Sequence, residues 1–297
     1  MNVHLKLVAM ALMWATSYPL GRWLAAYDAP QAIVAVRALI ACVFLGVIAN
    51  RRGELRLPWS PRLLAHLLLL AFCGFCVHNF LLFEALEHTR ANTGAVINGA
   101  IPVVVVVLDY LLFRRTVARW SVGGIAISFI GALIVVTHGD VAALVDGSLG
   151  YGEGLFLVAI TGWACYSIAA RPLLEQHAAL AVTTWACFAG FALLAPWTVV
   201  YWEQTRALLA EPGIVAILVL QGFLTMGLGF LWYYQGIRAL GPMNASVYIN
   251  LVPVFGVVLA ALTIGEMPDA PLVVGGLGVI GGLLVVNRAE TRRAALR

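Results

Sequence analysis

The stretches GAVINGAIPVVVVVLDYLLFRR (residues 94–115) and ASVYINLVPVFGVVLAALTIGE (residues 245–266) are two copies of one pattern. A shift of 151 residues pairs seven identical residues: Val96 with Val247, Pro102 with Pro253, Val103 with Val254, Val106 with Val257, Val107 with Val258, Leu108 with Leu259 and Leu111 with Leu262. Both copies are apolar enough for a membrane helix, yet both contain a proline and an asparagine. The chain is therefore expected to contain an internal repeat that carries polar groups at membrane depth.

The repeat extends into the neighbouring helices. Further matches, at shifts of 149 or 151 residues, are Trp14 with Trp163, Arg22 with Arg171, Gly124 with Gly275 and Gly131 with Gly282. Each half then holds five helices. Because five is odd, the second half is expected to enter the membrane with the opposite polarity. Such inverted repeats are typical of secondary transporters.

The composition indicates a membrane protein. Hydrophobic residues make up 62% of the chain and charged residues 11%, and the mean hydropathy is +0.95. Soluble domains hold about 45–50% apolar and about 25% charged residues, so lipid is the expected solvent. Nothing resembles a basic surface for nucleic acid. Runs long enough to cross a bilayer, about 20 apolar residues, are expected at 4–25, 30–49, 62–85, 91–112, 118–137, 152–171, 180–201, 212–238, 243–264 and 271–287.

The positive residues orient these ten spans. If the N-terminus is inside, the cytoplasmic loops collect Lys6, Arg51, Arg52, Arg56, Arg62, Arg114, Arg115, Arg119, Arg171, Arg238, Arg288, Arg292, Arg293 and Arg297, whereas the outer loops hold only Arg90 and Arg206. Because cytoplasmic loops carry the excess of Lys and Arg, both termini are predicted to be cytoplasmic. The expected division is a first five-helix repeat at 1–138, an outer linker at 139–151, a second repeat at 152–288 and a tail at 289–297.

Several motifs resemble a known family. They are ALMWATSYPLGRW at 11–23, its echo TGWACYSIAARP at 161–172, IVAVRAL around Arg37, and YQGIRALGPMNASVYINLVPVFGVVLAALTIGE at 234–266. The chain resembles the drug/metabolite transporter superfamily, specifically its ten-helix exporters built from two EamA-type repeats. Within that group it is most similar to bacterial amino-acid exporters, including those for aromatic amino acids. The resemblance implies export across the inner membrane of a bacterium.

The prolines and asparagines of the repeated stretch are candidates for function. Pro102 and Pro253 remove one backbone hydrogen bond each, so they are expected to bend their helices and to take part in gating. Asn98 and Asn250 lie about one turn before them. Two bent helices with mid-membrane amides predict the walls of a central cavity, in which both asparagines bind substrate. The alternative is that the amides only join helices by hydrogen bonds.

His78 is expected near the middle of the third span, where the corresponding residue of the second half is Gly229. An ionisable group at membrane depth is a candidate functional residue by default. The alternative is an interior histidine with purely structural partners. Four aromatic residues that lie well inside their spans are candidate substrate contacts, because most membrane tryptophans lie at the interfaces instead: Trp163, Trp185, Trp232 and Tyr248.

Arg37 is expected about two turns below the outer end of the second span, where an unpaired charge is costly. Glu84, at a similar depth in the third span, is its expected partner. The pair has two interpretations, a structural ion pair, or a gate in which Arg37 binds a carboxylate. Cys73 and Cys76 form a CxxC motif, which is expected to be helix packing rather than a metal site.

The sequence therefore predicts an all-α polytopic secondary transporter that exports neutral and aromatic amino acids and related metabolites by alternating access. Its predicted partners are a small-molecule substrate and the lipid bilayer. We expect no catalytic residue, metal, cofactor or nucleic acid, and oligomerisation is not required. Two alternatives stay open: the same machinery with sugars, nucleosides or drugs as cargo, and a membrane-embedded enzyme.

Overall fold

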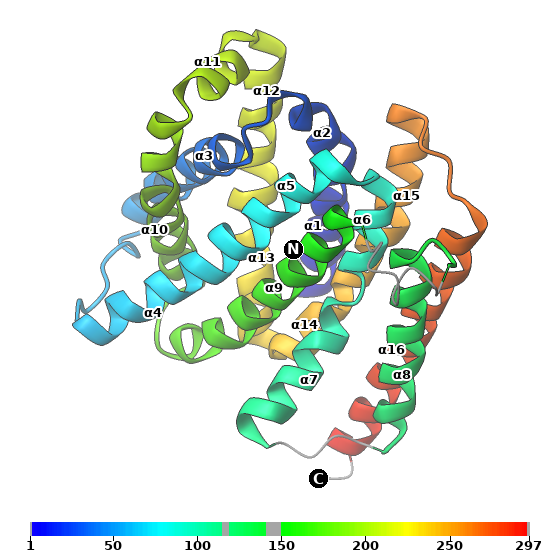
Figure 1. Cartoon of the computed structure of the whole chain (residues 1–297). Helices are drawn as coiled ribbons and strands as arrows, with labels where there is room; N and C mark the ends of the chain where they lie inside the picture. The colour runs from blue at the N-terminus through cyan, green and yellow to red at the C-terminus, as the bar shows by residue number, and fades with distance from the viewer. Residues whose placement is uncertain (1, 115–118, 141–149, 296–297) are drawn as a thin grey trace.

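The computed structural model describes residues 2–114, 119–140 and 150–295, and every segment of regular structure within them is helical (Figure 1). Most of the expected outer linker 139–151, together with Arg115 and the end of the tail, lies outside these residues. Seven described helices are long and apolar enough to cross a membrane: Pro30–Arg51, Pro61–His88, Ala91–Leu112, Tyr151–Gln176, Ala179–Val200, Pro212–Leu240 and Asn244–Ile264. This confirms an all-helical membrane protein, and the count of ten spans stays a prediction.

The remaining three expected spans differ in form. The first is divided into two helices that meet at Thr16, and the fifth and tenth have shorter apolar cores, at Trp120–Val135 and Ala270–Val286. The first half runs α1 (Val3–Ala15), α2 (Ser17–Leu24), the turn η1 (Ala25–Tyr27), α3 (Pro30–Arg51), α4 (Pro61–Ala71), η2 (Phe72–Asn79), α5 (Phe80–His88), α6 (Ala91–Asn98), α7 (Ile101–Phe113) and α8 (Arg119–Val136).

The second half follows the same order of spans, but one unbroken helix replaces α1, α2 and η1, a short helix and a 3-10 segment replace α6, and a short helix, α11, is added. It runs α9 (Tyr151–Gln176), α10 (Ala179–Val200), α11 (Trp202–Ala210), α12 (Pro212–Gln221), η4 (Gly222–Gly229), α13 (Phe230–Leu240), α14 (Pro242–Ser246), η5 (Val247–Asn250), α15 (Leu251–Ile264) and α16 (Ala270–Ala295). The segment η1 is a single 3-10 turn, and η5 is a 3-10 segment leading into α15.

Two π-helical segments mark the repeat in the backbone itself. They are η2 and η4, each eight residues long and offset by 150 residues. Long π-helices are rare, and short ones often occur at functional sites. Side chains bind carbonyl groups in both segments: Asn79 Nδ2 donates to Gly74 O (2.7 Å) and Trp14 Nε1 donates to Thr225 O (2.9 Å). The same irregularity at the same place supports a duplicated unit.

The repeated stretch of sequence forms broken helices. The helix α6 ends at Asn98 and α7 begins at Ile101, so Pro102 lies in a first turn, where its missing N–H leaves no partner unsatisfied. Pro253 likewise lies in the first turn of α15. An irregular turn therefore precedes each proline, at Gly99 and Ala100 before α7 and at η5 before α15, and the expected bend stays a prediction.

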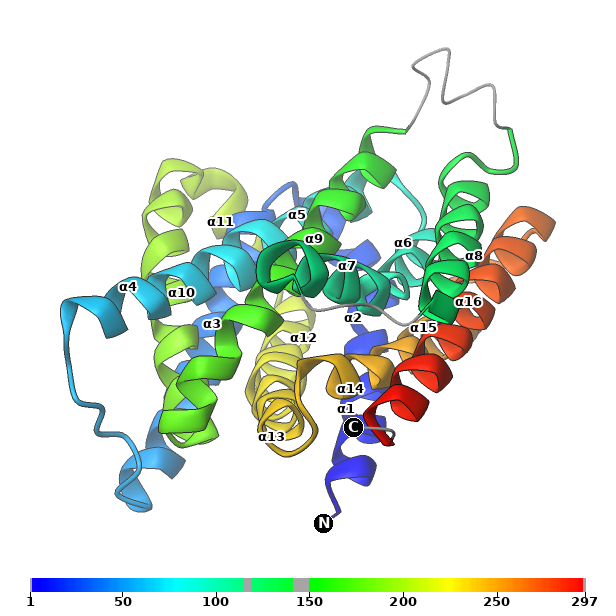
Figure 2. The same ribbon diagram turned by 90° about the horizontal axis from the view of Figure 1, so that it is seen from below.

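Equivalent helices of the two halves pack against one another in antiparallel fashion. The helices α8 and α16 lie side by side in both views (Figures 1 and 2). A methyl group on Gly124 would lie 2.5 Å from Gly282 O, and one on Gly131 would lie 2.6 Å from Gly275 O. Because Gly124 is equivalent to Gly275 and Gly131 to Gly282, the contact is self-reciprocal, as at a two-fold axis.

The helices α6 and α15 belong to the equivalent fourth and ninth spans, and they also cross in antiparallel fashion. A methyl group on Gly99 would lie 2.7 Å from Pro253 Cγ, and one on Gly256 would lie 2.7 Å from Ala95 Cβ. Residue numbers therefore rise along one helix in the direction in which they fall along the other, so the two helices are antiparallel. Small residues at such crossings let backbones approach closely, which drives helix association in lipid. These crossings position the residues of the site.

Candidate functional site

Two tryptophans at equivalent repeat positions meet at the centre of the molecule. Trp14 and Trp163 pack edge to face, with ring centroids 5.0 Å apart. Phe230 lies 5.1 Å from Trp163 and 5.9 Å from Trp14. Gly229 makes room for Trp14, because a methyl group at this position would lie 2.5 Å from Trp14 Nε1. The result is an aromatic centre contributed by both halves.

Beside this centre lies the central cavity, which we define by its polar and aromatic walls. Its polar lining residues are Ser17, Arg37, His78, Asn79, Asn98 and Thr225. Its aromatic lining residues are Trp14, Tyr18, Trp163 and Phe230. The centre of a water molecule can reach about 30 Å³ of it, which is room for one or two waters. The cavity is therefore narrow, and polar groups make up much of its wall.

Arg37 places a guanidinium group in this cavity. The residue is 2% exposed, its Nη2 donates to Thr225 Oγ1 at 2.6 Å, and its Cζ lies 4.6 Å from the centroid of the Phe83 ring. Thr225 Oγ1 accepts this bond because it donates its own proton to Gln221 O. The Nε and Nη1 groups of Arg37 have no hydrogen-bond partner among the described residues. Unpaired N–H groups of a buried cation are costly, so a bound anion is the natural partner.

His78 is held in one tautomer by the opposite repeat. Its Nδ1 lies 2.9 Å from Ala159 O in α9. Because a carbonyl oxygen only accepts, Nδ1 carries the proton, and Nε2 of the neutral ring is left as an acceptor. The ring also packs on Trp163, with centroids 4.6 Å apart. His78 thus connects the π-helical segment η2 to the aromatic centre.

Asn98 adds a second acceptor. It lies at the end of α6, where the helix breaks, and it is 5% exposed. Its Oδ1 has no partner among the described residues. The cavity therefore combines two free N–H groups of a cation with free acceptors and aromatic walls. This set of groups is complementary to a zwitterion with an apolar side chain.

The structure brings together some of the sequence-predicted residues and separates others. His78, Asn98, Trp163 and Arg37 line the central cavity, and Trp185, Trp232, Tyr248 and Asn250 are not among its lining residues. Trp185 donates to Leu55 O at 2.9 Å and packs on Trp59. Tyr248 bonds to His4, and Asn250 Nδ2 donates to Val247 O in its own turn. Depth in a span was therefore a poor guide to which aromatic residues meet.

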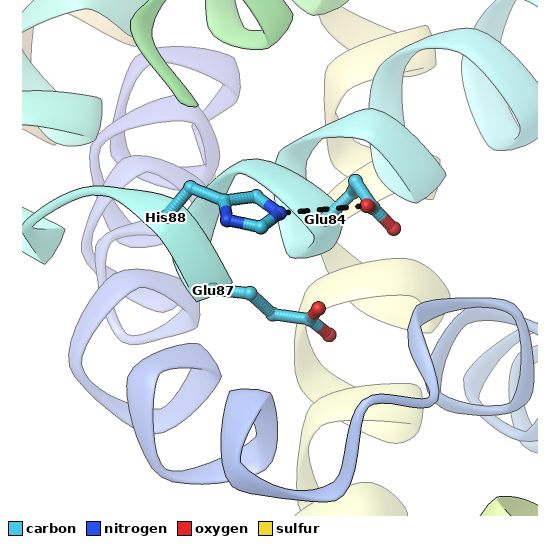
Figure 3. A group of neighbouring side chains, drawn as sticks. All are labelled: Glu84, Glu87 and His88. Atoms are coloured by element: carbon cyan, nitrogen blue, oxygen red, sulfur yellow. Dashed lines mark ion pairs between the residues drawn. The ribbon is translucent and has the colours of Figure 1, made fainter. Parts of the chain in front are cut away.

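Arg37 and Glu84 have different partners. Glu84 forms an ion pair with His88, with 3.7 Å between Oε1 and Nε2, and both belong to α5 (Figure 3). Glu84, Glu87 and His88 offer ligand atoms within 4.8 Å of one another. All three come from one helix, and acidic groups of this kind are common without an ion. We therefore assign no metal to this cluster.

Sequence reasoning missed three aromatic lining residues, namely Trp14, Tyr18 and Phe230. A signal existed for Trp14, because it is the repeat equivalent of Trp163. Phe230 was visible only as a member of an apolar span. Its role depends on the crossing of η4 and α13 with α1 and α3, which no local spacing specifies.

These features define a class: a helical membrane protein of two repeats, with a buried polar cavity where the repeats meet. The model of the EamA-like transporter family matches residues 1–137 and again residues 150–288. The chain therefore belongs to the EamA-like transporter family, whose members are transporters and not enzymes. The membrane-embedded enzyme considered above is thereby excluded, and the resemblance drawn from the motifs is confirmed at the level of the family.

Individual relatives are distant. The chain is 24% identical to an uncharacterized transporter, YyaM, of Bacillus subtilis, over 97% of this chain and 94% of that one. It is 26% identical to a probable terminal-alkyne amino-acid exporter of Streptantibioticus cattleyicolor, again over 97% and 94%. It is 29% identical to an S-adenosylmethionine/S-adenosylhomocysteine transporter of Chlamydia trachomatis, over 52% and 48%. A solved crystal structure covers 98% of both chains with a TM-score of 0.69 at 18% identity, a likeness of fold.

Proposed function

We propose that this transporter exports neutral amino acids, aromatic ones among them, and related metabolites, and that the central cavity binds them. The observation that carries the proposal is the pair of guanidinium nitrogens of buried Arg37, Nε and Nη1, that have no hydrogen-bond partner among the described residues. A carboxylate bound there would make charge-assisted hydrogen bonds, worth about 1.5–3 kcal/mol each. Every amino acid offers that carboxylate.

The other groups of the cavity suit the rest of the substrate. Asn98 Oδ1 and His78 Nε2 are acceptors for an ammonium group. Trp14, Trp163 and Phe230 form an apolar wall for a side chain. Aromatic walls with few polar groups are typical of small-molecule sites. A site of this kind would select substrates mainly by their amino and carboxylate groups and, to a lesser extent, by the shape of their side chains.

The printed names of two relatives support this substrate class. One is a probable amino-acid exporter and one transports S-adenosylmethionine, a methionine derivative. Both names refer to cargo with an amino-acid group. The direction, export across a bacterial inner membrane, follows from the family resemblance and is part of the proposal.

Alternating access requires two inverted repeats around the cavity. The antiparallel crossings of α8 with α16 and of α6 with α15 support inversion. The distribution of Lys and Arg supports ten spans with both termini cytoplasmic. The repeat boundaries, 1–138 and 152–288, belong to the same proposal.

Contacts close both ends of the proposed path. At the outer end, Arg90 Nη1 bonds to Asp269 Oδ2 at 3.1 Å and Asn92 N donates to Glu266 Oε2 at 3.2 Å. At the inner end, Lys6 Nζ donates to Gln235 Oε1 at 2.6 Å. With room for only a water or two, the cavity must open before an amino acid enters. In the proposed cycle, this structure represents a form with a narrow central cavity.

Flux in reconstituted vesicles tests the proposal. Labelled phenylalanine and threonine should enter vesicles that contain the protein faster than empty vesicles, and unlabelled amino acids should compete. An imposed pH gradient tests coupling, because facilitated diffusion would leave the flux unchanged. If no amino acid in a broad panel were transported, whereas sugars, nucleosides or drugs were, the protein would still be a transporter, but the proposed substrate class would be wrong.

A further inference from the structure

A second, larger cavity lies away from the aromatic centre. We call it the lateral cavity and define it by the start of α3 with the preceding Asp28, one face of η2 and α5, and the C-terminal half of α10. The centre of a water molecule can reach about 610 Å³ of it, against about 30 Å³ in the central cavity. The two cavities share no lining residue among the described residues. Volumes of about 300–1,000 Å³ are typical of sites for small molecules.

The lateral cavity has an apolar body and an acidic end. One face of η2 and α5 forms the first wall, because its lining residues recur every four positions: Phe72, Cys76, Phe80 and Glu84. Leu194, Trp197 and Tyr201 form the facing wall. Asp28, Gln31 and Glu84 are the polar lining residues, and no described lining residue carries a positive charge. The walls therefore favour an apolar ligand with a cationic head.

The charges around the acidic end reinforce this preference. Glu87 lies within electrostatic range of both Asp28 and Glu84. The neighbouring cation, Arg22, donates to Leu86 O and Glu87 O at the end of α5. Among the described residues, the two lining carboxylates, Asp28 and Glu84, thus face one neighbouring permanent positive charge, Arg22, which is already engaged with carbonyl groups, and His88 adds a second only when it is protonated.

Gln31 supplies an independent sign of a ligand. Its residue is only 6% exposed, its side chain lines the cavity, and it forms no hydrogen bond with any described residue. Its amide atoms are not among the fully buried side-chain atoms without a partner, so they face the space of the cavity, where a polar ligand group can bind them. Its carbonyl oxygen accepts from an ammonium, as the neighbouring carboxylates do.

The rim gives such a ligand a route of entry. Phe72, Trp197 and Tyr201 are about half exposed in segments that are long and apolar enough to face lipid. Amphipathic cations concentrate in bilayers with their heads at the interface, where Trp and Tyr are enriched. The exposed aromatic faces also attract cations.

We propose that the lateral cavity is a second binding site, for amphipathic organic cations. The charged amine lies between Asp28, Gln31 and Glu84, and the apolar body lies along Phe80, Trp197 and Tyr201. This site stands whether or not the central cavity takes amino acids, because the two cavities have separate walls. The class of ligand is an apolar amine of drug size.

Three probes with the same body separate the alternatives: 4-phenylbutylamine, 4-phenylbutanol and 4-phenylbutyrate. Calorimetric titration into phosphatidylcholine nanodiscs, with empty nanodiscs subtracted, should give an affinity for the amine at least about tenfold above that for the alcohol, the ratio that about 1.4 kcal/mol of charge preference produces. The acid is titrated into the Arg37→Met variant, because its carboxylate also fits the central cavity, and it should bind there at least about tenfold more weakly than the amine. The double variant Asp28→Asn with Glu84→Gln should abolish this preference. The matched control Glu203→Gln, an exposed carboxylate that is not a lining residue, should retain it.

Two further variants test whether the probes bind in the lateral cavity. Leu193→Trp adds bulk at the half-buried rim without disturbing the core, so it should weaken binding of all three probes, whereas Arg37→Met in the central cavity should leave amine binding unchanged. Equal affinity for amine, alcohol and acid would overturn the proposal in favour of a site for lipid chains. Unchanged amine affinity in the double variant, with a wild-type elution profile, would also overturn it. If only the amino-acid flux experiment failed, the result would contradict the proposed role of the central cavity and leave the proposal for the lateral cavity intact.

Discussion

Gly124 lies against Gly282 across the contact of α8 with α16, so closely that a methyl group on either residue would lie within 2.6 Å of the other's carbonyl oxygen. Gly131 and Gly275 repeat this contact two turns away. The residues are equivalent in reciprocal pairs, which joins the two halves about a two-fold relation. The same relation brings Trp14 onto Trp163, at the edge of the central cavity.

The first prediction concerns this glycine contact. Gly282→Ala should lower the stability of the folded protein by about 1–3 kcal/mol, because the added methyl group meets backbone atoms that cannot move aside. Gly281→Ala is the matched control, since a methyl group there has no neighbour within 4 Å. Thermal unfolding in detergent measures both. Equal melting temperatures for the two variants would contradict the reciprocal contact.

The second prediction concerns Arg37 as the carboxylate partner. Arg37→Met should weaken phenylalanine binding roughly 10- to 150-fold, the equivalent of about 1.5–3 kcal/mol for one charge-assisted hydrogen bond. Replacing phenylalanine by phenylalaninamide should cost the wild type a similar factor and the variant almost nothing. Arg171→Met is the control, because Arg171 bonds to Glu175 on its own exposed helix face. A variant that still prefers phenylalanine to its amide would show that Arg37 does not read the carboxylate.

The third prediction separates two tryptophans that the sequence analysis named as candidate substrate contacts. Trp163→Leu should weaken phenylalanine binding by about 0.5–1.5 kcal/mol, or roughly two- to tenfold, through lost aromatic contact. Trp185→Leu should leave affinity unchanged, because Trp185 packs on Trp59 and bonds to Leu55 O. Equilibrium binding to the purified variants measures the difference. If Trp185→Leu were the more damaging substitution, the assignment of the cavity would be wrong.

The fourth prediction concerns the outer contact of Arg90 with Asp269. Both side chains are about 40% exposed, and such pairs contribute about 0–1 kcal/mol and weaken in salt. Asp269→Asn should therefore change amino-acid flux by less than about fivefold, the equivalent of that energy. The change should shrink as salt is raised. Asparagine keeps the oxygen that accepts from Leu272 N, so α16 retains its first turn.

Glu203→Gln is the control for this experiment, since Glu203 pairs only within α11, with Arg206. A larger effect of Asp269→Asn that salt did not alter would mean that the pair does more than hold the outer end closed. An effect of the same size in Glu203→Gln would instead point to general surface charge.

The helical membrane architecture could be predicted from the sequence because it depends on the hydrophobic composition and on the repeat of residues at a fixed spacing. Helices in lipid must satisfy their own backbone groups, so a long apolar run is enough to predict one. The repeat was visible in identical residues at fixed shifts. The local form of some spans could not be predicted from the sequence: Thr16 divides the first span, and both prolines lie in the first turn of an α-helix.

The sequence by itself determined a helical membrane protein of two related halves, and it singled out His78, Asn98, Trp163 and Arg37. Only the tertiary structure decided that these four share a cavity, that Arg37 bonds to Thr225 rather than to Glu84, and that Trp185 lies elsewhere. The reason is physical. Apolar length acts locally along the chain, whereas the neighbours of a buried side chain depend on how helices far apart in sequence cross.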